Sequence, residues 1–421
     1  MREQWPVRPA TGRVDARVAL PGSKSLTIRA LAAAALASNR SHIYGALTAD
    51  DPMAMARALD HLGVGVQTGG DPWTVDGTDG RLHPKEATVD ACQSALSARL
   101  LVAIAVLGTG ELTVEGGGSL KRRPMTGLVD ALADWGVEVH SDGTVPVTVM
   151  GRSGLRGGPV RVDCGVTSQF ATALLMVSPM ADEAADVRID GLGGSRGYLD
   201  LTVEVMRAFG AEVEPTITGY RVEPTGYRPS DFVVEPDASA AVYPMVAAAI
   251  SGGRVEIGGL RADSSQPDMA VSVVLQQMGC RLESTDAGMV VEGPDGSLRP
   301  FRGDLSGMPD GALAVAAACL FADGPSELTG LGSLRHKESN RLDALASEID
   351  RLGASATIDG DTLVIRPGSI TPVTIDPHGD HRMAMALAPI GLVVPGLVID
   401  HPGVVDKTWP GFWAMLDELA G

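Results

Sequence analysis

Residues 132–139 (LADWGVEV) join the end of an amphipathic helix to a strand through a single glycine. Glycine adopts the left-handed conformation at low cost, so we expect it to end the helix. Successive glycines of this kind are 69 to 74 residues apart, and Gly421 follows 68 residues after Gly353. The other copies of this helix-glycine-strand motif are residues 58–66 (ALDHLGVGV), 205–213 (VMRAFGAEV), 275–282 (LQQMGCRL) and 349–356 (IDRLGASA).

A period of about seventy residues is too long for a solenoid repeat and favours a small β/α subdomain. Six such units divide three and three, with one crossing near residues 234–238. We expect the leading strand, residues 13–20, to complete the truncated sixth unit and to return the chain through Pro21-Gly22. The sequence therefore predicts an α/β protein with two domains, residues 1–22 plus 236–421 and residues 23–235.

Composition excludes several classes of protein. A net charge of -18 repels nucleic acids and anionic membranes, and 4% aromatic residues provide few stacking surfaces for bases. No apolar stretch approaches the roughly 20 residues of a membrane span, and residues 1–6 do not resemble an export signal. Cysteines 92, 164, 280 and 319 lack metal-site spacing. We expect a cytoplasmic protein with reduced thiols and no metal.

Residues 21–25 (PGSKS) place a lysine and two hydroxyls before an alanine-rich helix, predicted over residues 26–37. A helix N-terminus of this kind binds anions, although the stretch lacks the glycine pattern of a P-loop. Two interpretations stay open: Ser25 is a plain N-cap with Lys24 solvated, or both residues hold an anion. Arg29 lies one turn further along the same face.

Other cations gather at turns. A single such charge is usually solvated, but in a chain this acidic the set indicates a site for phosphates and carboxylates. Besides Arg99, the set comprises residues 116–124 (GGGSLKRRP), 335–341 (RHKESNR), 380–382 (DHR) and 406–407 (DK).

Three polar positions each allow a structural and a chemical interpretation. Residues 167–169 (TSQ) precede an apolar helix, where they either cap it or hold phosphate oxygens. Asp310 precedes another apolar helix, as an N-cap or as a general base. Glu338 lies between Lys337 and Arg341, as a structural ion pair or as an acid-base group.

Taken together and in order, these motifs resemble the 5-enolpyruvylshikimate-3-phosphate synthases over almost the whole chain. The resemblance implies an enolpyruvyl transferase fold, in which each of two domains contains three β-α-β-α-β-β units as an inside-out α/β barrel. The motifs are residues 21–25 (PGSKS) with Arg29, 123–125 (RPM), 167–176 (TSQFATALLM), 309–310 (PD), 337–342 (KESNRL), 380–385 (DHRMAM) and 407–408 (KT).

The resemblance also implies a reaction. The carboxyvinyl group of phosphoenolpyruvate would move to the 5-hydroxyl of 3-phosphoshikimate, releasing phosphate, on the way to chorismate and the aromatic amino acids. It implies no cofactor and no macromolecular partner, and we expect a monomer. The implied catalytic residues are Lys24, Asp310, Lys337 and Glu338.

The implied binding residues fall into two sets. For the acceptor, they are Ser25, Arg29 and Tyr198 at the carboxylate, Thr167, Ser168 and Ser195 at the phosphate, Gln169 at the ring, and Asp310, Ser333 and Lys337. For phosphoenolpyruvate, they are Lys24, Ala95, Arg123, Gln169, Arg341, Arg382 and Lys407.

Two regions of the sequence depart from the family pattern. The family carries Asn-Ala-Gly-Thr shortly before the arginine that aligns with Arg99, whereas here Ala95 replaces the glycine and Leu96 the threonine. Ser333 replaces a usual asparagine. Two alternatives therefore remain, a secondary-metabolism paralogue acting on another cyclic hydroxy acid and a non-catalytic binding protein of the same fold. A sister family acting on a UDP-sugar usually has a cysteine within residues 116–123, and none is present.

The departure at Ala95 predicts insensitivity to glyphosate, which occupies the phosphoenolpyruvate site of related enzymes. Because a methyl group intrudes where the inhibitor approaches the family's glycine, we expect binding about 5- to 150-fold weaker, equivalent to ~1–3 kcal/mol. Ala95→Gly should lower mainly the inhibition constant, and adding Leu96→Thr should also lower KM for phosphoenolpyruvate. Inhibition kinetics measure both constants, and equal sensitivity of the parent and the double variant would contradict the alignment of this loop.

Overall fold

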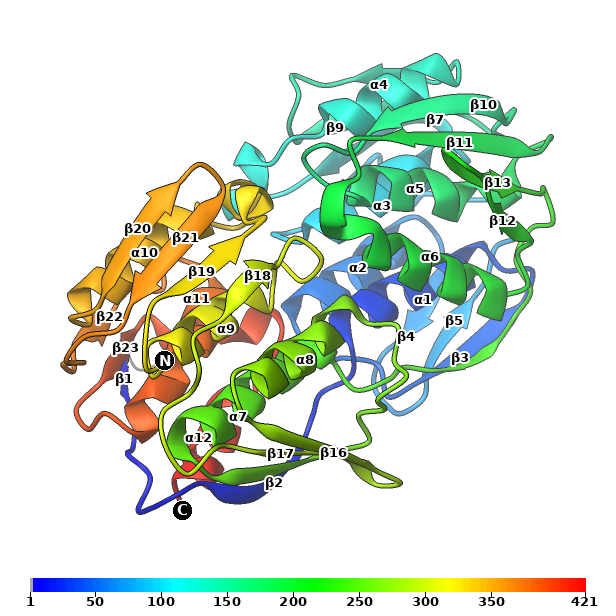
Figure 1. The fold of residues 1–421 in the computed structure, drawn as a ribbon. Helices are drawn as coiled ribbons and strands as arrows, with labels where there is room; N and C mark the ends of the chain where they lie inside the picture. Colours follow the sequence, from blue (N-terminus) through cyan, green and yellow to red (C-terminus); the bar gives the residue numbers. More distant parts are fainter. Residues whose placement is uncertain (1–2) are drawn as a thin grey trace. The chain divides into compact units, whose positions relative to one another are not determined.

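The computed structural model describes residues 3–421, and the chain separates into two compact units (Figure 1). Unit 1 comprises Met1–Pro21 and Pro236–Gly421, and unit 2 comprises Gly22–Glu235. Each unit contains three small sheets and is built from β-α-β-α-β-β segments.

The three sheets of unit 2 share one pattern, in which a parallel pair of strands is followed by two antiparallel strands. Their orders are β14-β3-β5-β4, β6-β7-β9-β8 and β10-β11-β13-β12. The strands are β3 (Arg40–Tyr44), β4 (Gly65–Gln67), β5 (Trp73–Asp76), β6 (Thr88–Asp90), β7 (Thr109–Glu115), β8 (Glu138–His140), β9 (Val147–Arg152), β10 (Gly158–Asp163), β11 (Ala185–Asp190), β12 (Val213–Pro215), β13 (Gly219–Val222) and β14 (Asp231–Val233).

Unit 1 repeats this pattern twice and ends with a three-stranded sheet. The orders are β16-β17-β15-β2, β18-β19-β21-β20 and β1-β23-β22. The strands are β1 (Gln4–Pro6), β2 (Asp15–Ala19), β15 (Arg254–Gly258), β16 (Arg281–Thr285), β17 (Gly288–Glu292), β18 (Arg302–Asp304), β19 (Ser326–Thr329), β20 (Ser355–Asp359), β21 (Thr362–Arg366), β22 (Thr374–Ile375) and β23 (Val398–Asp400).

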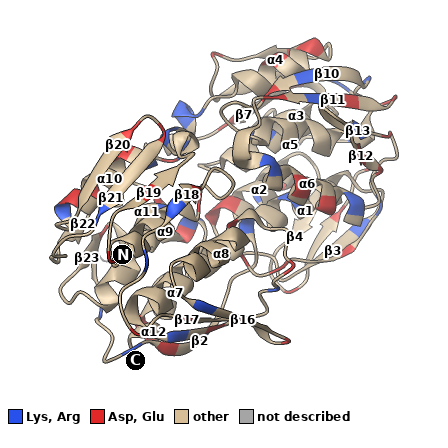
Figure 2. Ribbon diagram, viewed as in Figure 1, with Lys and Arg blue, Asp and Glu red and all other residues tan. Residues whose placement is uncertain are grey.

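A trio of buried helices forms the core of each unit. In unit 2, α1 (Lys24–Leu36), α3 (Ala95–Ala105) and α5 (Gln169–Val177) contact one another and are buried almost throughout. In unit 1, α9 (Ala312–Cys319) packs against α7 (Ala238–Ser251) and α11 (His381–Leu387). Figure 2 shows that α7 and α9 carry no charged residue. Helices that are apolar on every side belong in a core, and the sheets pack around them.

The remaining helices are amphipathic and expose one face. They are α2 (Asp50–His61), α4 (Thr126–Asp134), α6 (Arg196–Ala208), α8 (Ala270–Gln277), α10 (Arg341–Arg351) and α12 (Phe412–Ala420). No helix within residues 3–421 is both long enough and apolar enough to cross a membrane.

The leading strand pairs differently from the prediction. β2 lies parallel to β15 in the fourth sheet along the chain, whereas the truncated sixth sheet is completed by β1, which pairs with β23. The parallel edge of the first sheet is instead supplied by β14, which pairs with β3. At each crossing between the units, the last strand before the crossing pairs within the unit that the chain is leaving. Repeat spacing does not reveal this pairing, because the partner strand is far away in the sequence.

The predicted helix-ending glycines are confirmed. Their φ angles lie between 80° and 107° at residues 63, 136, 210, 279, 353 and 421, which is the left-handed region. At Gly63 an added Cβ would lie 2.4 Å from the carbonyl oxygen of His83, whereas at Gly136 it would meet nothing within 4 Å.

Alanine substitutions at these two glycines distinguish the cost of backbone strain from the cost of steric crowding. Gly136→Ala should lower the free energy of unfolding by about 1 kcal/mol, because alanine is strained at positive φ. Gly63→Ala should cost at least about 1 kcal/mol more, because its methyl group also displaces the His83 carbonyl. Urea unfolding of both variants measures the difference, and equal losses would show that the contact at residue 83 relaxes freely.

Candidate active site

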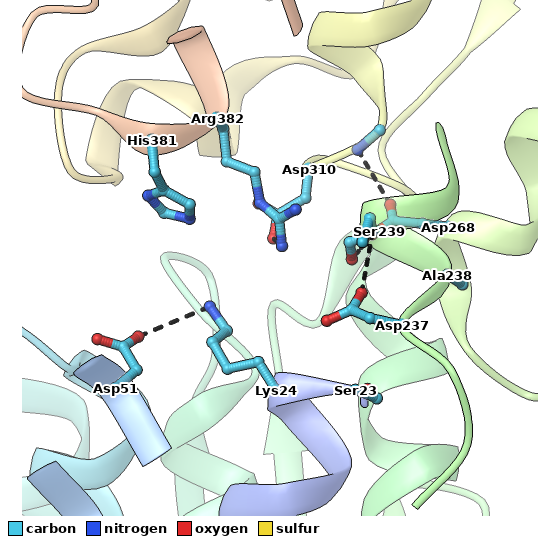
Figure 3. Close-up of polar contacts among 12 residues, drawn as sticks. Ser23, Lys24, Asp51, Asp237, Ala238, Ser239, Asp268, Asp310, His381 and Arg382 are labelled. Atoms are coloured by element: carbon cyan, nitrogen blue, oxygen red, sulfur yellow. Dashed lines mark hydrogen bonds and ion pairs between the residues drawn. The ribbon is translucent and has the colours of Figure 1, made fainter. Parts of the chain in front are cut away.

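Helix α1 begins two residues earlier than predicted, so Ser25 is not its N-cap. The cap is Ser23, whose Oγ accepts a hydrogen bond of 3.4 Å from the amide of Leu26. Lys24 is the first helical residue, and its Nζ lies 3.8 Å from Asp51 Oδ2 (Figure 3). Its side chain keeps 15% of its surface exposed. Lys24 therefore offers a reachable cation at a helix N-terminus, where the helix dipole also favours anions.

Arg29 is a buried cation in the same helix. Its side chain donates hydrogen bonds to Thr202 Oγ1 at 2.8 Å and to the backbone carbonyls of Ser25 at 3.0 Å and Tyr198 at 3.3 Å. These partners are neutral, and no acidic side chain of residues 3–421 forms an ion pair with Arg29. Burial lowers the pKa of its guanidinium to about 10. An approaching carboxylate would relieve this electrostatic cost.

Arg99 links three predicted motifs of unit 2. Its guanidinium donates to Gln169 Oε1 and to the carbonyl of Pro124, the latter at 2.9 Å, and lies 4.9 Å from the centre of the Phe170 ring. Only 1% of its surface is exposed. Arg99 thus fixes the positions of Gln169 and of the segment that carries Arg123, which is itself buried.

Ala95 and Leu96 form the first turn of α3, after the N-cap Ser94. They are 3% and 6% exposed and belong to the hydrophobic core of unit 2. The two residues that differ from the family pattern therefore pack among apolar side chains at the start of a buried helix.

Ser168 is the N-cap residue of α5, but its side chain makes no capping hydrogen bond. The capping interpretation is therefore wrong for the Ser168 hydroxyl. Thr167 Oγ1 instead accepts from the amide of Gln169 at 3.3 Å. Ser195 and Tyr198 lie at the start of α6, and the Tyr198 carbonyl is the one that Arg29 contacts. Arg29 thus joins α1 to the start of α6, and α5 packs against both helices.

In unit 1, Arg341 binds three carboxylates at once. Its guanidinium lies 2.7 Å from Asp310, 2.9 Å from Glu338 and 2.7 Å from Asp380. Burial by itself would lower the pKa of Arg341, but the three carboxylates raise it above its ordinary value. The side chain is 1% exposed. Arg341 therefore organises acidic groups that the sequence had spread over residues 310–380.

Asp310 does not cap α9, whose N-cap is Gly311 and has no side-chain cap. Its carboxylate is held by Arg341 and, at 3.3 Å, by Arg382. Arg382 also donates to the hydroxyl of Tyr243 at 3.0 Å, while its buried Nε has no hydrogen-bond partner among residues 3–421. Burial opposes the charge of Arg382, but Tyr243 and Asp310, with other acids, raise its pKa. The N-cap interpretation failed because two guanidiniums attract this carboxylate more strongly than a helix amide does.

The remaining predicted residues of unit 1 lie in 3-10 turns. Ser333 belongs to Gly332–His336 and Lys407 ends Pro402–Lys407, while Lys337 follows the first of these turns. The Ser333 hydroxyl is buried without a hydrogen-bond partner in the described chain. Lys337 and Lys407 are half-buried.

Sequence reasoning missed Asp268, which is 2% exposed. Its carboxylate accepts hydrogen bonds from the hydroxyl of Ser239 and, at 3.0 Å, from the amide of Gly311 (Figure 3). An aspartate between Pro267 and Met269 looks like an ordinary helix start, so no local signal distinguished it. Asp380 was noticed only as part of a cationic motif, although its carboxylate is a main partner of Arg341.

These contacts define the chemistry that each unit can perform. Unit 1 holds carboxylates against guanidiniums, an arrangement suited to proton transfer next to bound anions. Unit 2 offers hydroxyls, a lysine and an arginine at helix starts, an arrangement suited to binding phosphates and carboxylates. Among residues 3–421, no group of three or more histidine, cysteine or acidic side chains is arranged to hold a metal ion.

Comparison with known proteins agrees with this chemistry. The family model described as EPSP synthase (3-phosphoshikimate 1-carboxyvinyltransferase) matches residues 9–416. A 3-phosphoshikimate 1-carboxyvinyltransferase of Methanosphaerula palustris is 38% identical over 412 residues, covering 96% of this chain and 97% of that protein. One of Rhizobium leguminosarum bv. trifolii is 37% identical, covering 98% and 96%.

Two solved structures show the same fold. The EPSP synthase of Acinetobacter baumannii superimposes with a TM-score of 0.83 at 24% identity, covering 99% of this chain and 98% of that one. The enolpyruvyl transferase NikO of Streptomyces tendae superimposes with a TM-score of 0.77 at 20% identity, covering 99% and 97%.

The fold is therefore that of the enolpyruvyl transferases, and the predicted fold class is confirmed. More particularly, the chain belongs to the EPSP synthase (3-phosphoshikimate 1-carboxyvinyltransferase) family, which confirms the resemblance found in its motifs.

Arg341 generates a stability prediction. Arg341→Met should lower the free energy of unfolding by about 3–5 kcal/mol at pH 8, because it leaves buried carboxylates without their cation. Arg335→Met, which removes the cation of the partly exposed ion pair with Asp343, should cost less than about 1 kcal/mol. The buried carboxylates of the folded Arg341→Met variant should bind protons more readily than those of its unfolded chain. The loss in free energy of unfolding relative to the parent should therefore be smaller at pH 5 than at pH 8. Denaturant titrations at both pH values test this, and a deficit independent of pH would contradict it.

Proposed function

We propose that this protein transfers the carboxyvinyl group of phosphoenolpyruvate to the 5-hydroxyl of 3-phosphoshikimate and releases phosphate. The observation that carries the proposal is the carboxylate cluster around Arg341. Within it the side chains of Asp310, Glu338 and Asp380 are 18%, 8% and 0% exposed, so Asp310 is the member a substrate reaches most easily. The EPSP synthase relatives support this reaction for the chain.

The proposed chemistry is general acid-base catalysis. Glu338 protonates the methylene carbon of phosphoenolpyruvate, which makes its C2 electrophilic. Asp310, with Lys337 near the same oxygen, takes the proton of the acceptor hydroxyl, whose oxygen then bonds to C2 and forms a tetrahedral ketal phosphate. Loss of phosphate, together with a proton from the new methyl group, restores the vinyl group. Lys24 stabilises the charge on the departing phosphate.

For the acceptor, we assign the carboxylate to Arg29 together with Ser25 and Tyr198. Arg29 is suited to this role because its buried charge has only neutral partners within unit 2. The phosphate is assigned to the hydroxyls at the starts of α5 and α6, and Gln169 packs against the ring. Those hydroxyls belong to Thr167, Ser168 and Ser195, and Ser333 contributes from its 3-10 turn.

For phosphoenolpyruvate, the assigned cations bind its phosphate and carboxylate groups. Arg382 has a buried Nε with no hydrogen-bond partner among the described residues, which supports its assignment to an anion. Arg341 contributes mainly by holding Asp310 and Glu338 in place. The full set is Lys24, Arg123, Arg341, Arg382 and Lys407, with Ala95 and Gln169 as neighbours of the bound molecule.

The names of the sequence relatives favour 3-phosphoshikimate over another cyclic hydroxy acid as the acceptor. The likeness to NikO concerns the fold alone, at 20% identity, so it does not favour the paralogue alternative. Intact Lys24, Asp310 and Glu338 speak against a non-catalytic binding protein. The monomeric state and cytoplasmic location stay predictions of the sequence.

Release of inorganic phosphate from phosphoenolpyruvate tests the function. We expect release with 3-phosphoshikimate and far less with shikimate, because unphosphorylated shikimate leaves the α5 and α6 hydroxyls without their ligand. Other cyclic hydroxy acids serve as competing acceptors. Faster release with one of them would assign the chain to the paralogue alternative, and no release with any acceptor would overturn the proposal.

Two variants separate chemistry from binding. Asp310→Asn should lower kcat by about 10²-fold or more, the usual scale for a positioned base, while acceptor binding changes little. Lys407→Ala should instead raise KM for phosphoenolpyruvate, because it removes a cation from that molecule alone. Steady-state kinetics measure both effects. Parental kcat in Asp310→Asn would remove Asp310 from the mechanism, and an effect of Lys407→Ala on the acceptor alone would refute its assignment.

A further inference from the structure

Asp268 lies in the 3-10 turn Pro267–Met269, directly before α8, and has no direct part in the proposed reaction. Its carboxylate is 2% exposed and contacts two other segments of unit 1. Oδ1 accepts from the amide of Gly311 at 3.0 Å, and Oδ2 accepts from the hydroxyl of Ser239 in the first turn of α7. The carboxylate thereby joins the starts of three helices.

The contact with Gly311 fixes the residue next to Asp310. A Cβ at position 311 would lie 2.5 Å from Cγ2 of Val271 and 3.1 Å from Oδ1 of Asp268, so this turn is closely packed. The backbone of Asp310 is therefore held from one side by Asp268, while its carboxylate is held by Arg341 and Arg382. Both constraints act on the orientation of the same side chain.

Electrostatically, Asp268 is an unfavourable group in its position. Burial, and after it the nearby charge of Asp310, raises the pKa of Asp268 to about 6, against the opposing effects of Arg382 and of the Ser239 and Gly311 hydrogen bonds. The other ionisable groups around this part of the cluster are Asp237, Tyr243 and Arg341. A structural role would be filled as well by an asparagine, which makes the same contacts without a buried charge.

Two guanidiniums on Asp310 hold it in its ionised form and so weaken it as a base. A like charge nearby has the opposite effect, because it makes a proton on Asp310 more favourable. The charge that is unfavourable for folding is therefore favourable for proton transfer.

We propose that Asp268 is a positioning residue for Asp310, which it orients through the amide of Gly311 and keeps basic through its own negative charge. This inference rests on the proposed function, in which Asp310 accepts the proton of the acceptor hydroxyl. Asp268 touches no substrate in this role and acts only through its neighbour.

Asp268→Asn tests the role of the charge, because the amide can accept from Gly311 and donate to Ser239. We expect kcat to fall by roughly tenfold, because Asp310 becomes a weaker base, with both KM values within about twofold of the parent. The acidic limb of the kcat profile should move to lower pH, since a weaker base stays ionised further into acid. Asp263→Asn, which removes an exposed acid of the same region, should change none of these quantities.

Thermal stability tests whether the charge of Asp268 is unfavourable for folding. The folded pKa of Asp268 lies above its ordinary value of 3.8, so its charge costs stability above about pH 6 and costs none below 3.8. Asp268→Asn should therefore raise the Tm at pH 8 and leave it nearly unchanged at pH 4. A purely structural aspartate would instead give a kcat that falls only with the folded fraction and an acidic limb that does not move.

Ser239→Ala provides a second, milder variant. Losing this hydrogen bond makes a proton on Asp268 more favourable and so weakens its negative charge beside Asp310. The acidic limb of kcat should therefore move to lower pH, as in Asp268→Asn but by a smaller amount. Parental kcat with an unmoved acidic limb in Asp268→Asn, or a lower Tm at pH 8, would overturn the inference. Parental phosphate release is measured first, because an inactive parent overturns the proposed function and this inference together, whereas an active parent with an unaffected Asp268→Asn overturns the inference alone.

Discussion

The burial of three apolar helices in each unit is the constraint from which the position of the chemistry follows. A helix surrounded on all sides by core can carry polar groups only at its ends, where the backbone also has unsatisfied amides. Many of the candidate residues accordingly lie at or near the starts of these six helices. They include Lys24 and Arg29 at α1, Ser94 and Arg99 at α3, Thr167 to Gln169 at α5, Asp237 and Ser239 at α7, Asp310 at α9, and Asp380 and Arg382 at α11.

The two units use helix starts in different ways. In unit 2 the charged groups at these ends are cations, which the positive end of a helix dipole disfavours unless an anion is present. In unit 1 carboxylates accept hydrogen bonds from amides at helix starts, as Asp237 does from Ala240 and Asp380 from Arg382, and guanidiniums balance their charge. Unit 2 thus presents cations at these helix starts, whereas unit 1 keeps acids and bases charged in its own interior.

The repeated helix-glycine-strand phrase made the fold class predictable, because a left-handed glycine marks each helix end independently of tertiary structure. The resemblance made the site residues predictable as a set, although their individual roles stay predictions. Local reasoning failed where partners were distant in sequence. It considered Ser25 but not Ser23 as a cap, it offered capping of α9 but not Arg341 as a structural role for Asp310, and it could not see that Asp268 reaches Gly311. It also misplaced β2, because strand pairing is decided by which sheet edge is free once the whole chain has folded.

The placement of β1 and β2 has a consequence for the order of events at the ribosome. Unit 2 is continuous, so every strand of its three sheets has been synthesised once β14 emerges. Unit 1 cannot be completed so early, because β2 must wait for residue 254 and β1 for residue 398 before their partners exist. Until then β1 and β2 have no partner strands, although they are attached to a unit that is already able to fold. Vectorial synthesis therefore favours one sequence of assembly, in which the middle of the chain matures first and its two ends meet last.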